Sequence, residues 1–477
     1  MIHLRCFILF FIVSYCSLKG QELTIQPHEF ISKTNDTVQA ELGTFRVPLN
    51  RSNTDTTTIP LSFIRFKSTN PNPASPIVYL AGGPGGSGSE TAKRNRFELF
   101  MKLREVGDVI AFDQRGTGLS YRPINCDEKL SFAVDRPVLK DEYVKRTIAM
   151  YTKCIEFWKE NNQDFYAFNT AESAADIEAL RKVLTAEKIS LWGISYGSHL
   201  AFKYIRRYED KVDRAVLASL EGPDQTIKLP QHTDDFIERL SKRAETNYGE
   251  QPTYPALLKT IRTVHDKFKN NDKILTYTTR RGDTAHIGIS LFELQQSIAI
   301  FYLKNPNNSK ALSKLYTDMS NRNYDEIAPK VEILKRWMFR GERLMPIAMD
   351  LQSGISRERS KLYEKQVNEA LLGDGVNFLA YEWMNSLPYQ MLPDDFRELK
   401  TNHVSALLLS GDLDGRTYIP AAKEIAKHFK NGQHIIVQNA GHDLYMASDE
   451  IQQTVVDFFG GKQITENKLS VAPVPFN

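Results

Sequence analysis

The sequence predicts an α/β fold, with a mostly parallel sheet, helices on both faces and an inserted helical lid. Three observations predict it: short apolar runs recur near both ends of the chain, helical segments lie between them, and one long helical stretch interrupts the alternation. Runs that are apolar on both sides suit strands covered on both faces, which is typical of a parallel sheet. A chain of 477 residues can bury a large core and hold more than one structural unit.

The predicted strands are short and end in turn residues. A polar stretch joins the first two, and several later ones run into glycine-rich or acidic turns. The strands are expected over 42–49, 58–67, 76–81, 107–112, 189–193, 215–220, 405–410 and 434–437. Helices are expected over 170–184, 195–207 and 420–429, and the first of them places its apolar residues on one stripe. Alternating strands and helices favour a doubly wound α/β domain.

The alternation fails between about residues 225 and 403. That region reads as successive helices rich in Leu, Tyr and charged residues, with no convincing strand run. It is too long for a structureless loop, so we expect a helical lid inserted between two strands, over their C-terminal ends. The expected organisation is a signal peptide over 1–20, a first core part over 21–224, the lid over 225–403, and a second core part with the C-terminal tail over 404–477.

The N-terminus has the features of a secretory signal peptide. Arg5 is followed by an apolar run and then by small and polar residues through Gly20. The run is well short of the ~20 residues that a membrane-spanning helix needs. We expect cleavage after Gly20 and an exported protein, periplasmic or secreted; a buried N-terminal strand is the alternative. Lipid anchoring at Cys16 is a further alternative, disfavoured by the bulky Tyr15 before it.

Net charge and cysteine content bear on partners and compartment. The formal charge of +3 is nearly balanced for this length, so neither nucleic acid nor an acidic membrane surface is an expected partner. Cys126 and Cys154 remain after removal of the leader, an even pair in an exported chain. A disulfide between them would close a loop of about 28 residues and stabilise the fold by ~3 kcal/mol. Two buried free thiols are the alternative.

The segment Gly193-Ile194-Ser195-Tyr196-Gly197 carries the candidate nucleophile. Gly-x-Ser-x-Gly alone is a weak signal in a chain with 26 glycines. Here it follows a predicted strand and precedes a predicted helix, which is the strand–turn–helix context of a nucleophile elbow. Ser195 would then lie above the sheet edge, at a helix N-terminus. A plain glycine-lined turn is the alternative.

A serine needs a base and an orienting acid to act as a nucleophile, and both are expected downstream. His442 follows the last strand run and is the expected base. The turn after the previous strand offers Asp412 and Asp414. We expect Asp414, nearer the tip of the turn, to orient His442, and Asp412 to cap the turn. The predicted catalytic triad is therefore Ser195, Asp414 and His442.

A tetrahedral oxyanion needs two backbone N–H donors. We expect one from Tyr196 and the other from Gly83, in a glycine-rich loop where backbone without side chains can approach a substrate closely. His199 is expected to be a packed or capping residue, while His232 and His403 flank the lid. No cluster of His, Cys and Asp has metal-ligand spacing, so neither a metal nor a cofactor is expected.

Six short segments, spread along the chain from residue 82 to residue 442, form a recognisable series. They are 82–88 (Gly-Gly-Pro-Gly-Gly-Ser-Gly), 112–120 (Phe-Asp-Gln-Arg-Gly-Thr-Gly-Leu-Ser), 169–176 (Asn-Thr-Ala-Glu-Ser-Ala-Ala-Asp), 193–197, 411–417 (Gly-Asp-Leu-Asp-Gly-Arg-Thr) and 441–442 (Gly-His). Together they resemble the prolyl aminopeptidase and tripeptidyl aminopeptidase-like branch of the α/β-hydrolase fold family, over about residues 40 to 460. The resemblance implies an α/β-hydrolase fold and the same triad. It also puts Cys126 and Cys154 where tripeptidyl-type members carry a cysteine pair.

The chain departs from that branch near the expected site. Ala81 stands where prolyl aminopeptidases usually have His, and the segment 418–420 (Tyr-Ile-Pro) adds a residue to the usual Thr-Pro. Both departures weaken a transfer of specificity from the prolyl enzymes. Aminopeptidases of this branch hold the substrate's free amine with acidic residues, and Glu221, just past a predicted strand, is the candidate here. A solvated or strand-capping Glu is the alternative.

These features predict an exported serine hydrolase that removes residues from peptide N-termini through an acyl-enzyme. Its expected partners are peptides with a free N-terminus, without nucleic acid, metal or stable membrane insertion. A carboxylester hydrolase with the same triad is the first alternative. A catalytically silent binding protein on the same fold is the second.

Overall fold

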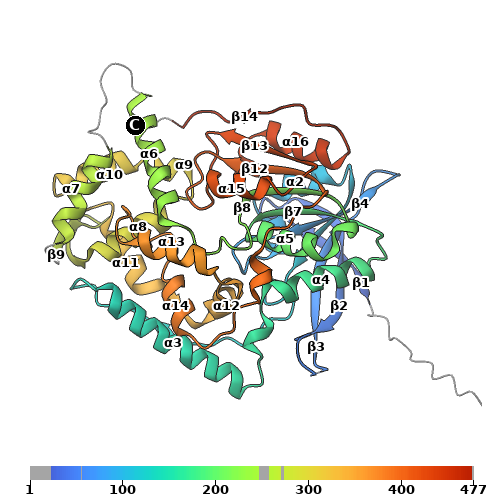
Figure 1. Cartoon of the computed structure of the whole chain (residues 1–477), viewed down its shortest axis with the longest axis horizontal. Coiled ribbons are helices and arrows are strands. Elements are labelled where there is room, and N and C mark those ends of the chain that lie inside the picture. Colours follow the sequence, from blue (N-terminus) through green and yellow to red (C-terminus); the bar gives the residue numbers. More distant parts are fainter. Residues whose placement is uncertain (1–22, 55, 247–256, 270–272, 475–477) are drawn as a thin grey trace, which may run out of the picture.

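A computed structural model of the chain describes residues 23–54, 56–246, 257–269 and 273–474. The predicted signal peptide over 1–20, including Cys16, lies outside these residues. The described chain is organised around a ten-stranded sheet, with the helices α6 to α14, within residues 230–386, gathered to one side of it (Figure 1). No helix in the described ranges is both long and apolar enough to cross a membrane.

The sheet is antiparallel at one edge and parallel through the rest. Its strand order is β1-β2-β3-β5-β4-β7-β8-β12-β13-β14, antiparallel from β1 to β5 and parallel from β5 to β14. The strands are β1 (Thr24–Ile31), β2 (Thr37–Pro48), β3 (Thr58–Phe66), β4 (Ala74–Leu80), β5 (Gly107–Asp113), β7 (Ile189–Ser195), β8 (Val212–Leu220), β12 (Ser405–Gly411), β13 (Gly432–Gln438) and β14 (Leu469–Ser470). All the predicted strands are present. The edge strands β1 and β14 are absent from the prediction, because mostly exposed or very short strands carry no apolar run.

Alternate side chains of the central strands enter two separate cores. Val78 and Leu80 of β4 join the core under α4, α5 and α15, whereas Ile77 and Tyr79 join the core under α1, α2 and α16. Burial on both faces explains why these strands read as continuous apolar runs. The covering helices are α1 (Gly88–Lys93), α2 (Phe97–Leu103), α4 (Thr170–Val183), α5 (Tyr196–Tyr208), α15 (Ile419–Ala426) and α16 (Asp449–Phe459). The three predicted helices are confirmed as α4, α5 and α15.

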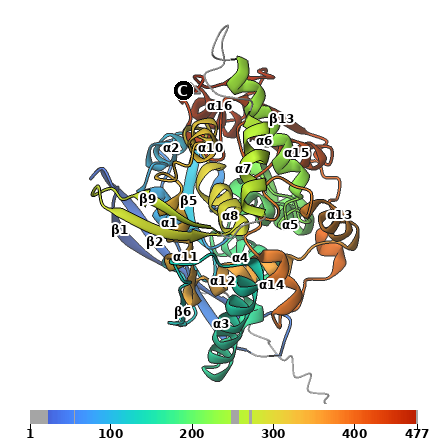
Figure 2. The ribbon, with the colours of Figure 1, turned by 90° about the vertical axis from the view of Figure 1, so that its left-hand side faces the viewer.

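A long segment between β8 and β12 forms the lid, which faces the viewer in Figure 2 with α6, α7 and α8 in front of the sheet. Its helices are α6 (Pro230–Thr246), α7 (Leu257–Lys269), α8 (Leu291–Tyr302), α9 (Pro306–Ser309), α10 (Leu312–Ser320), α11 (Ala328–Trp337), α12 (Leu344–Ser353), α13 (Arg357–Val367) and α14 (Ala380–Ser386). Short 3₁₀ turns lie at Phe165–Ala167, Glu209–Lys211, Gly341–Arg343, Asp394–Arg397 and Leu444–Met446.

The expectation that the lid contains no strand is wrong. A hairpin of β9 (Lys273–Thr278) and β10 (Thr284–Ile289) pairs antiparallel within it. Leu275 and Tyr277 of β9 are buried and alternate with exposed residues, and Gly282 takes a φ of +87° in the connecting turn. This period of two is the signal of a half-buried strand, but it lies among longer helical patterns.

A helix that precedes the lid in sequence packs with it. Helix α3 (Lys140–Glu160) runs along the lid below α11, α12 and α14 (Figure 1). Trp383 Nε1 of α14 donates to Thr147 Oγ1 of α3 at 2.9 Å, and a two-strand ladder joins β6 (Lys129–Leu130) to β11 (Phe339–Arg340). Helix α3, which precedes the expected division at residue 224, therefore packs against the lid. The disulfide between Cys126 and Cys154, which links α3 to the chain before it, is confirmed.

Candidate active site

Ser195 lies at the junction of β7 and α5, above the parallel part of the sheet. Its backbone takes φ 55° and ψ −128°, a conformation that L-residues rarely adopt. The turn is tight: a Cβ on Gly197 would lie 2.0 Å from Leu80 O, and one on Gly193 would lie 2.8 Å from Gly197 O. Only glycine fits at these two positions, so the Gly-x-Ser-x-Gly spacing is required by the close approach of neighbouring backbone.

Asp414 and His442 meet across two neighbouring loops, after β12 and β13. His442 Nδ1 lies 2.9 Å from Asp414 Oδ2, and both side chains are almost fully buried. Asp414 Oδ1 accepts from the backbone N–H groups of Arg416 at 2.7 Å and Thr417 at 3.0 Å, while Oδ2 accepts from Thr417 Oγ1 at 2.6 Å. Burial alone would raise the pKa of Asp414, but His442 and the Thr417 donors lower that pKa to about 2. Asp414 is therefore a carboxylate that holds the imidazole ring of His442 in place.

The residues that compete for these roles have other partners. Asp412 binds the Arg243 guanidinium and accepts from Asn439 N at 2.7 Å, so it ties the acid turn to the loop after β13. His199 is fully buried and bridges Gly222 O and Ser353 Oγ, each at 3.1 Å. Burial lowers the pKa of His199. These contacts agree with the expected capping and packing roles.

Ser195 and His442 line one open cavity of about 570 Å³. Gly82 and Gly83 also line it, and a Cβ on Gly82 would lie 3.1 Å from Ser195 Cβ. The glycine-rich loop thus lies directly against the candidate nucleophile, while the Tyr196 amide begins α5 beside it. The oxyanion roles of Gly83 and Tyr196 remain predictions.

The segment 112–120 contacts the glycine-rich loop, and the segment 169–176 in turn contacts 112–120. Asp113 accepts from the hydroxyls of Ser87 at 2.7 Å and Ser89 at 2.6 Å, which fixes the chain just after the glycines. Arg115 is fully buried and makes a two-point contact with Asp176, at 2.7 and 2.8 Å. Buried charges are retained when they are paired and hydrogen-bonded in this way. The segments hold the scaffold and do not line either cavity beside Ser195.

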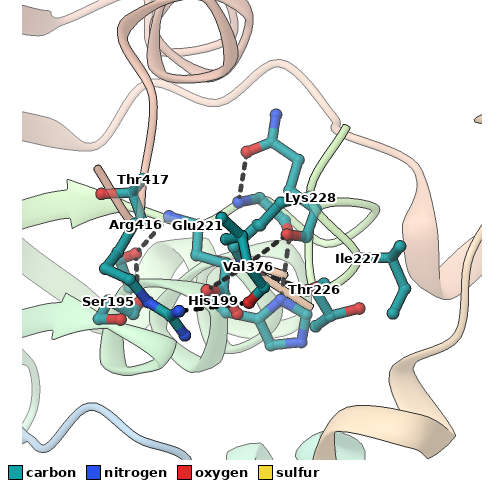
Figure 3. Close-up of polar contacts among 12 residues, drawn as sticks. Ser195, His199, Glu221, Thr226, Ile227, Lys228, Val376, Arg416 and Thr417 are labelled. Carbon is teal, nitrogen blue, oxygen red and sulfur yellow. Dashed lines mark hydrogen bonds and ion pairs between the residues drawn. The ribbon is translucent and has the colours of Figure 1, made fainter. Parts of the chain in front are cut away.

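A second, more enclosed cavity of about 190 Å³ opens on the other side of Ser195. Polar and apolar side chains share its wall, where Glu221 and Asp350 bring two carboxyl groups and Lys228 and Arg416 bring two cations. Figure 3 shows Ser195, Glu221, Lys228 and Arg416 gathered in one group. Lys228 Nζ donates to Glu221 Oε2 at 2.6 Å, so the structure places Glu221 at the site but already paired with a cation.

Asp350 is the acid that sequence reasoning missed. Its Oδ1 is buried with no hydrogen-bond partner among the described residues. Burial, followed by repulsion from Glu221, raises the pKa of Asp350 well above its ordinary value. It is the one charged residue of the helix α12. A lone acid in an apolar helix is a signal in the sequence, although its position beside Ser195 arises only from folding.

The lid touches both loops that carry Asp414 and His442. We call residues 303–306, which join α8 to the first residue of α9, the lid strap. Its Leu303 O accepts from Gly415 N at 3.2 Å, and its Lys304 O accepts from His442 N at 3.2 Å. A Cβ on Gly441 would lie 2.3 Å from Pro306 Cδ, so the strap packs against bare backbone. The position of His442 therefore depends on the lid as well as on the sheet.

Several known proteins and one family model are similar to this chain. A family model described as alpha/beta hydrolase fold matches residues 75–449. A tripeptidyl aminopeptidase from Streptomyces lividans is 29% identical over 159 residues, 31% of this chain and 29% of the relative. Serine protease Hip1 from Mycobacterium tuberculosis is 27% identical over 191 residues, 38% and 36% of the two chains. A putative proline iminopeptidase from Mycoplasma genitalium is 25% identical over 215 residues, 43% and 52%.

These matches span about three-tenths to about half of the relatives' lengths. Among solved structures, a proline iminopeptidase-related protein from Thermus thermophilus aligns over 88% of this chain and 97% of its own. Its sequence identity is 14% and its TM-score is 0.37.

Proposed function

This chain belongs to the α/β-hydrolase fold family, and from that membership we propose that it is a serine hydrolase that cleaves residues from peptide N-termini. The predicted fold and the resemblance to the aminopeptidase-like branch are confirmed. The observation that carries the proposal is the Asp414–His442 contact, 2.9 Å long, in loops that face Ser195 across one cavity. An oriented histidine beside an elbow serine is the arrangement that acyl transfer needs.

The proposed reaction proceeds in two steps. Ser195 Oγ attacks the carbonyl carbon of the scissile bond while His442 Nε2 takes the hydroxyl proton, and the amides of Tyr196 and Gly83 stabilise the oxyanion. The intermediate collapses, the C–N bond breaks and His442 protonates the departing amine. Water then attacks the acyl-enzyme with His442 as base, which releases the acid and restores Ser195. Asp414 stays ionised and holds His442 Nδ1–H throughout.

The enclosed cavity supports an aminopeptidase over an esterase. A substrate ammonium placed there would give Asp350 Oδ1 the partner that it lacks, and would lie beside Glu221 as well. Because Asp350 has a raised pKa, ammonium binding would shift it to the carboxylate and form a charge-assisted hydrogen bond. An ester substrate without an amine would leave that acid buried and unpartnered. The chemistry of the cavity therefore favours a free N-terminus.

Kinetics on matched substrates test the proposal. We expect release of a chromophore from aminoacyl or tripeptidyl anilides with a free amine, and kcat/KM roughly ten- to hundred-fold lower for the N-acetylated forms. Asp350→Asn and Glu221→Gln should each reduce that ratio, and Ser195→Ala should abolish both turnover and labelling by a fluorophosphonate. Equal rates on free and acetylated substrates, or turnover of esters without amides, would contradict the aminopeptidase proposal.

We also propose that the protein is exported. The Cys126–Cys154 disulfide supports this, because structural disulfides persist in oxidising compartments. N-terminal sequencing of the protein from its native host should give a chain that begins at Gln21. A chain that retains residues 1–20 in a reducing compartment would refute export and leave the catalytic proposal unaffected.

A further inference from the structure

The two cavities that meet at Ser195 differ in their balance of charge. The enclosed cavity is lined by the acids Glu221 and Asp350 and by the cations Arg416 and Lys228, the latter paired with Glu221. The open cavity is lined by the cations Arg94, Arg96, Lys304, Arg343 and Arg416, against the single acid Asp443. A cleft lined by one sign of charge concentrates ligands of the other sign.

The open cavity lies on the leaving-group side of Ser195. His442 lines the open cavity and is not among the residues that line the enclosed one. In the proposed reaction His442 protonates the departing amine, so the departing fragment must lie where His442 can reach it. The acyl part, with its free amine, then occupies the enclosed cavity and the leaving peptide occupies the open one.

Two of the open cavity's cations are free for a ligand. Arg96 is bound to Asp443 and to the Tyr79 hydroxyl. By contrast, Lys304 and Arg343 have exposed side chains with no hydrogen bond or ion pair to any part of the chain that the structure describes. Their charges are therefore not neutralised by the protein.

These two cations come from separate parts of the lid. Lys304 belongs to the lid strap, and its carbonyl holds the His442 amide at 3.2 Å, so its main chain is fixed beside the leaving-group side. Arg343 immediately precedes α12, the helix that carries Asp350. A ligand anion between them would contact the lid at two points while its amide bond lies at Ser195.

We propose that Lys304 and Arg343 bind the free α-carboxylate of a short leaving peptide. This inference rests on the proposed function and names its substrate class: short peptides with both termini free, whose ammonium binds Asp350 in the enclosed cavity and whose carboxylate lies in the open, cationic one. Long chains and peptide amides lack a carboxylate within reach of the site. The enzyme thus acts on small oligopeptides in preference to proteins.

A pair of peptides that differ in one group tests this. Tetra-alanine and tetra-alanine amide share a free N-terminus and all peptide bonds, and either can lose one or three residues, so product release can be followed by mass spectrometry. We expect kcat/KM to be roughly ten-fold higher for the acid, through a lower KM. The preference should shrink as sodium chloride is raised, because salt screens charges in an open cavity.

Variants assign the preference to the two residues. Lys304→Gln and Arg343→Gln should each reduce the acid-to-amide ratio roughly three-fold, and the double variant should bring it near one. Lys159→Gln, an exposed lysine at the end of α3, is the matched control and should keep the wild-type ratio. The rate of Ser195 labelling by a fluorophosphonate reports that each variant is folded.

The outcomes separate the inference from the function on which it rests. Equal kcat/KM for the two peptides in the wild type, or a ratio unchanged in the double variant, would overturn the inference while the aminopeptidase stands. Failure of the wild type to cleave either peptide would count against the proposed function, and the inference would fall with it.

Discussion

Replacing Asp414 with Asn tests whether this acid orients His442. Asp414 Oδ1 accepts two backbone N–H groups, from Arg416 and Thr417, so the amide oxygen of the variant must stay on that side. The new NH₂ group then takes the place of Oδ2, which faces Thr417 Oγ1 at 2.6 Å and His442 Nδ1 at 2.9 Å. Two donors cannot share that contact. His442 must move its proton from Nδ1 to Nε2, and Nε2 can no longer accept the Ser195 proton.

The expected loss follows from that tautomer. Loss of the base in an otherwise intact triad lowers kcat by about 10⁴-fold, equivalent to about 5 kcal/mol of transition-state stabilisation. KM should change little, because Asp414 is buried behind His442 and does not line either cavity. The effect should therefore appear in kcat and in the rate of fluorophosphonate labelling alike.

The same contacts predict a pH-dependent effect on stability. The pKa of Asp414 is lowered to about 2 in the fold, below its unfolded value of about 3.9. Its stabilising contribution, of the order of 2–3 kcal/mol, is thus complete above about pH 4 and is lost as pH falls toward 2. The difference in free energy of unfolding between wild type and Asp414→Asn should shrink over that window.

Asp412→Asn is the matched control, two residues away in the same turn. The side chain of Asp412 is held by Arg243 and Asn439 and does not contact His442, so this variant should keep kcat within a few-fold of wild type. Stopped assays with a free-amine anilide, together with labelling kinetics, distinguish the two variants. Retention of more than a tenth of wild-type kcat in Asp414→Asn, or an equal loss in Asp412→Asn, would refute the assignment of the acid.

Three further changes have defined outcomes. Asp350→Asn should raise KM for free-amine substrates and also stabilise the fold as pH rises above about 4. The buried carboxyl has a raised pKa, so in the wild type the free energy of unfolding falls as pH rises above the carboxyl's unfolded pKa, and the amide removes that loss. Thermal unfolding across pH measures the difference, and a variant less stable than wild type at neutral pH would contradict it. Gly441→Ala should lower kcat at least ten-fold, because the new Cβ would lie 2.3 Å from Pro306 Cδ and displace the lid strap. Gly460→Ala is the control, because its Cβ would come no closer than 3.3 Å to any neighbouring atom. Replacing Cys126 and Cys154 together with Ser should reduce the free energy of unfolding by about 3–4 kcal/mol, since the bond closes a loop of 28 residues; an unchanged denaturant midpoint would show that the bond adds nothing.

Local patterns were sufficient to predict eight of the ten strands of the sheet and the three candidate catalytic residues. Strands buried on both faces must be continuously apolar, and parallel strands end at one edge, so the residues after β7, β12 and β13 meet there. Ser195, Asp414 and His442 each lie at or just past the end of such a strand. Sequence position alone therefore indicated that they come together, and the tight Gly193–Gly197 turn left one conformation for the serine.

The lid's contribution was decided by tertiary structure alone. Asp350 in α12, the lid strap and Arg343 are far from Ser195 in sequence, and no periodicity tells which lid residues face the sheet edge. Helix α3 precedes the lid in sequence, yet its partners are α14 and the buried Glu293–Lys335 pair of the lid. The sequence by itself determined where the candidate nucleophile, acid and base stand, because periodicity and turn chemistry act within a few residues. The charges that surround a substrate came from non-local packing, which brings separate helices to one cavity.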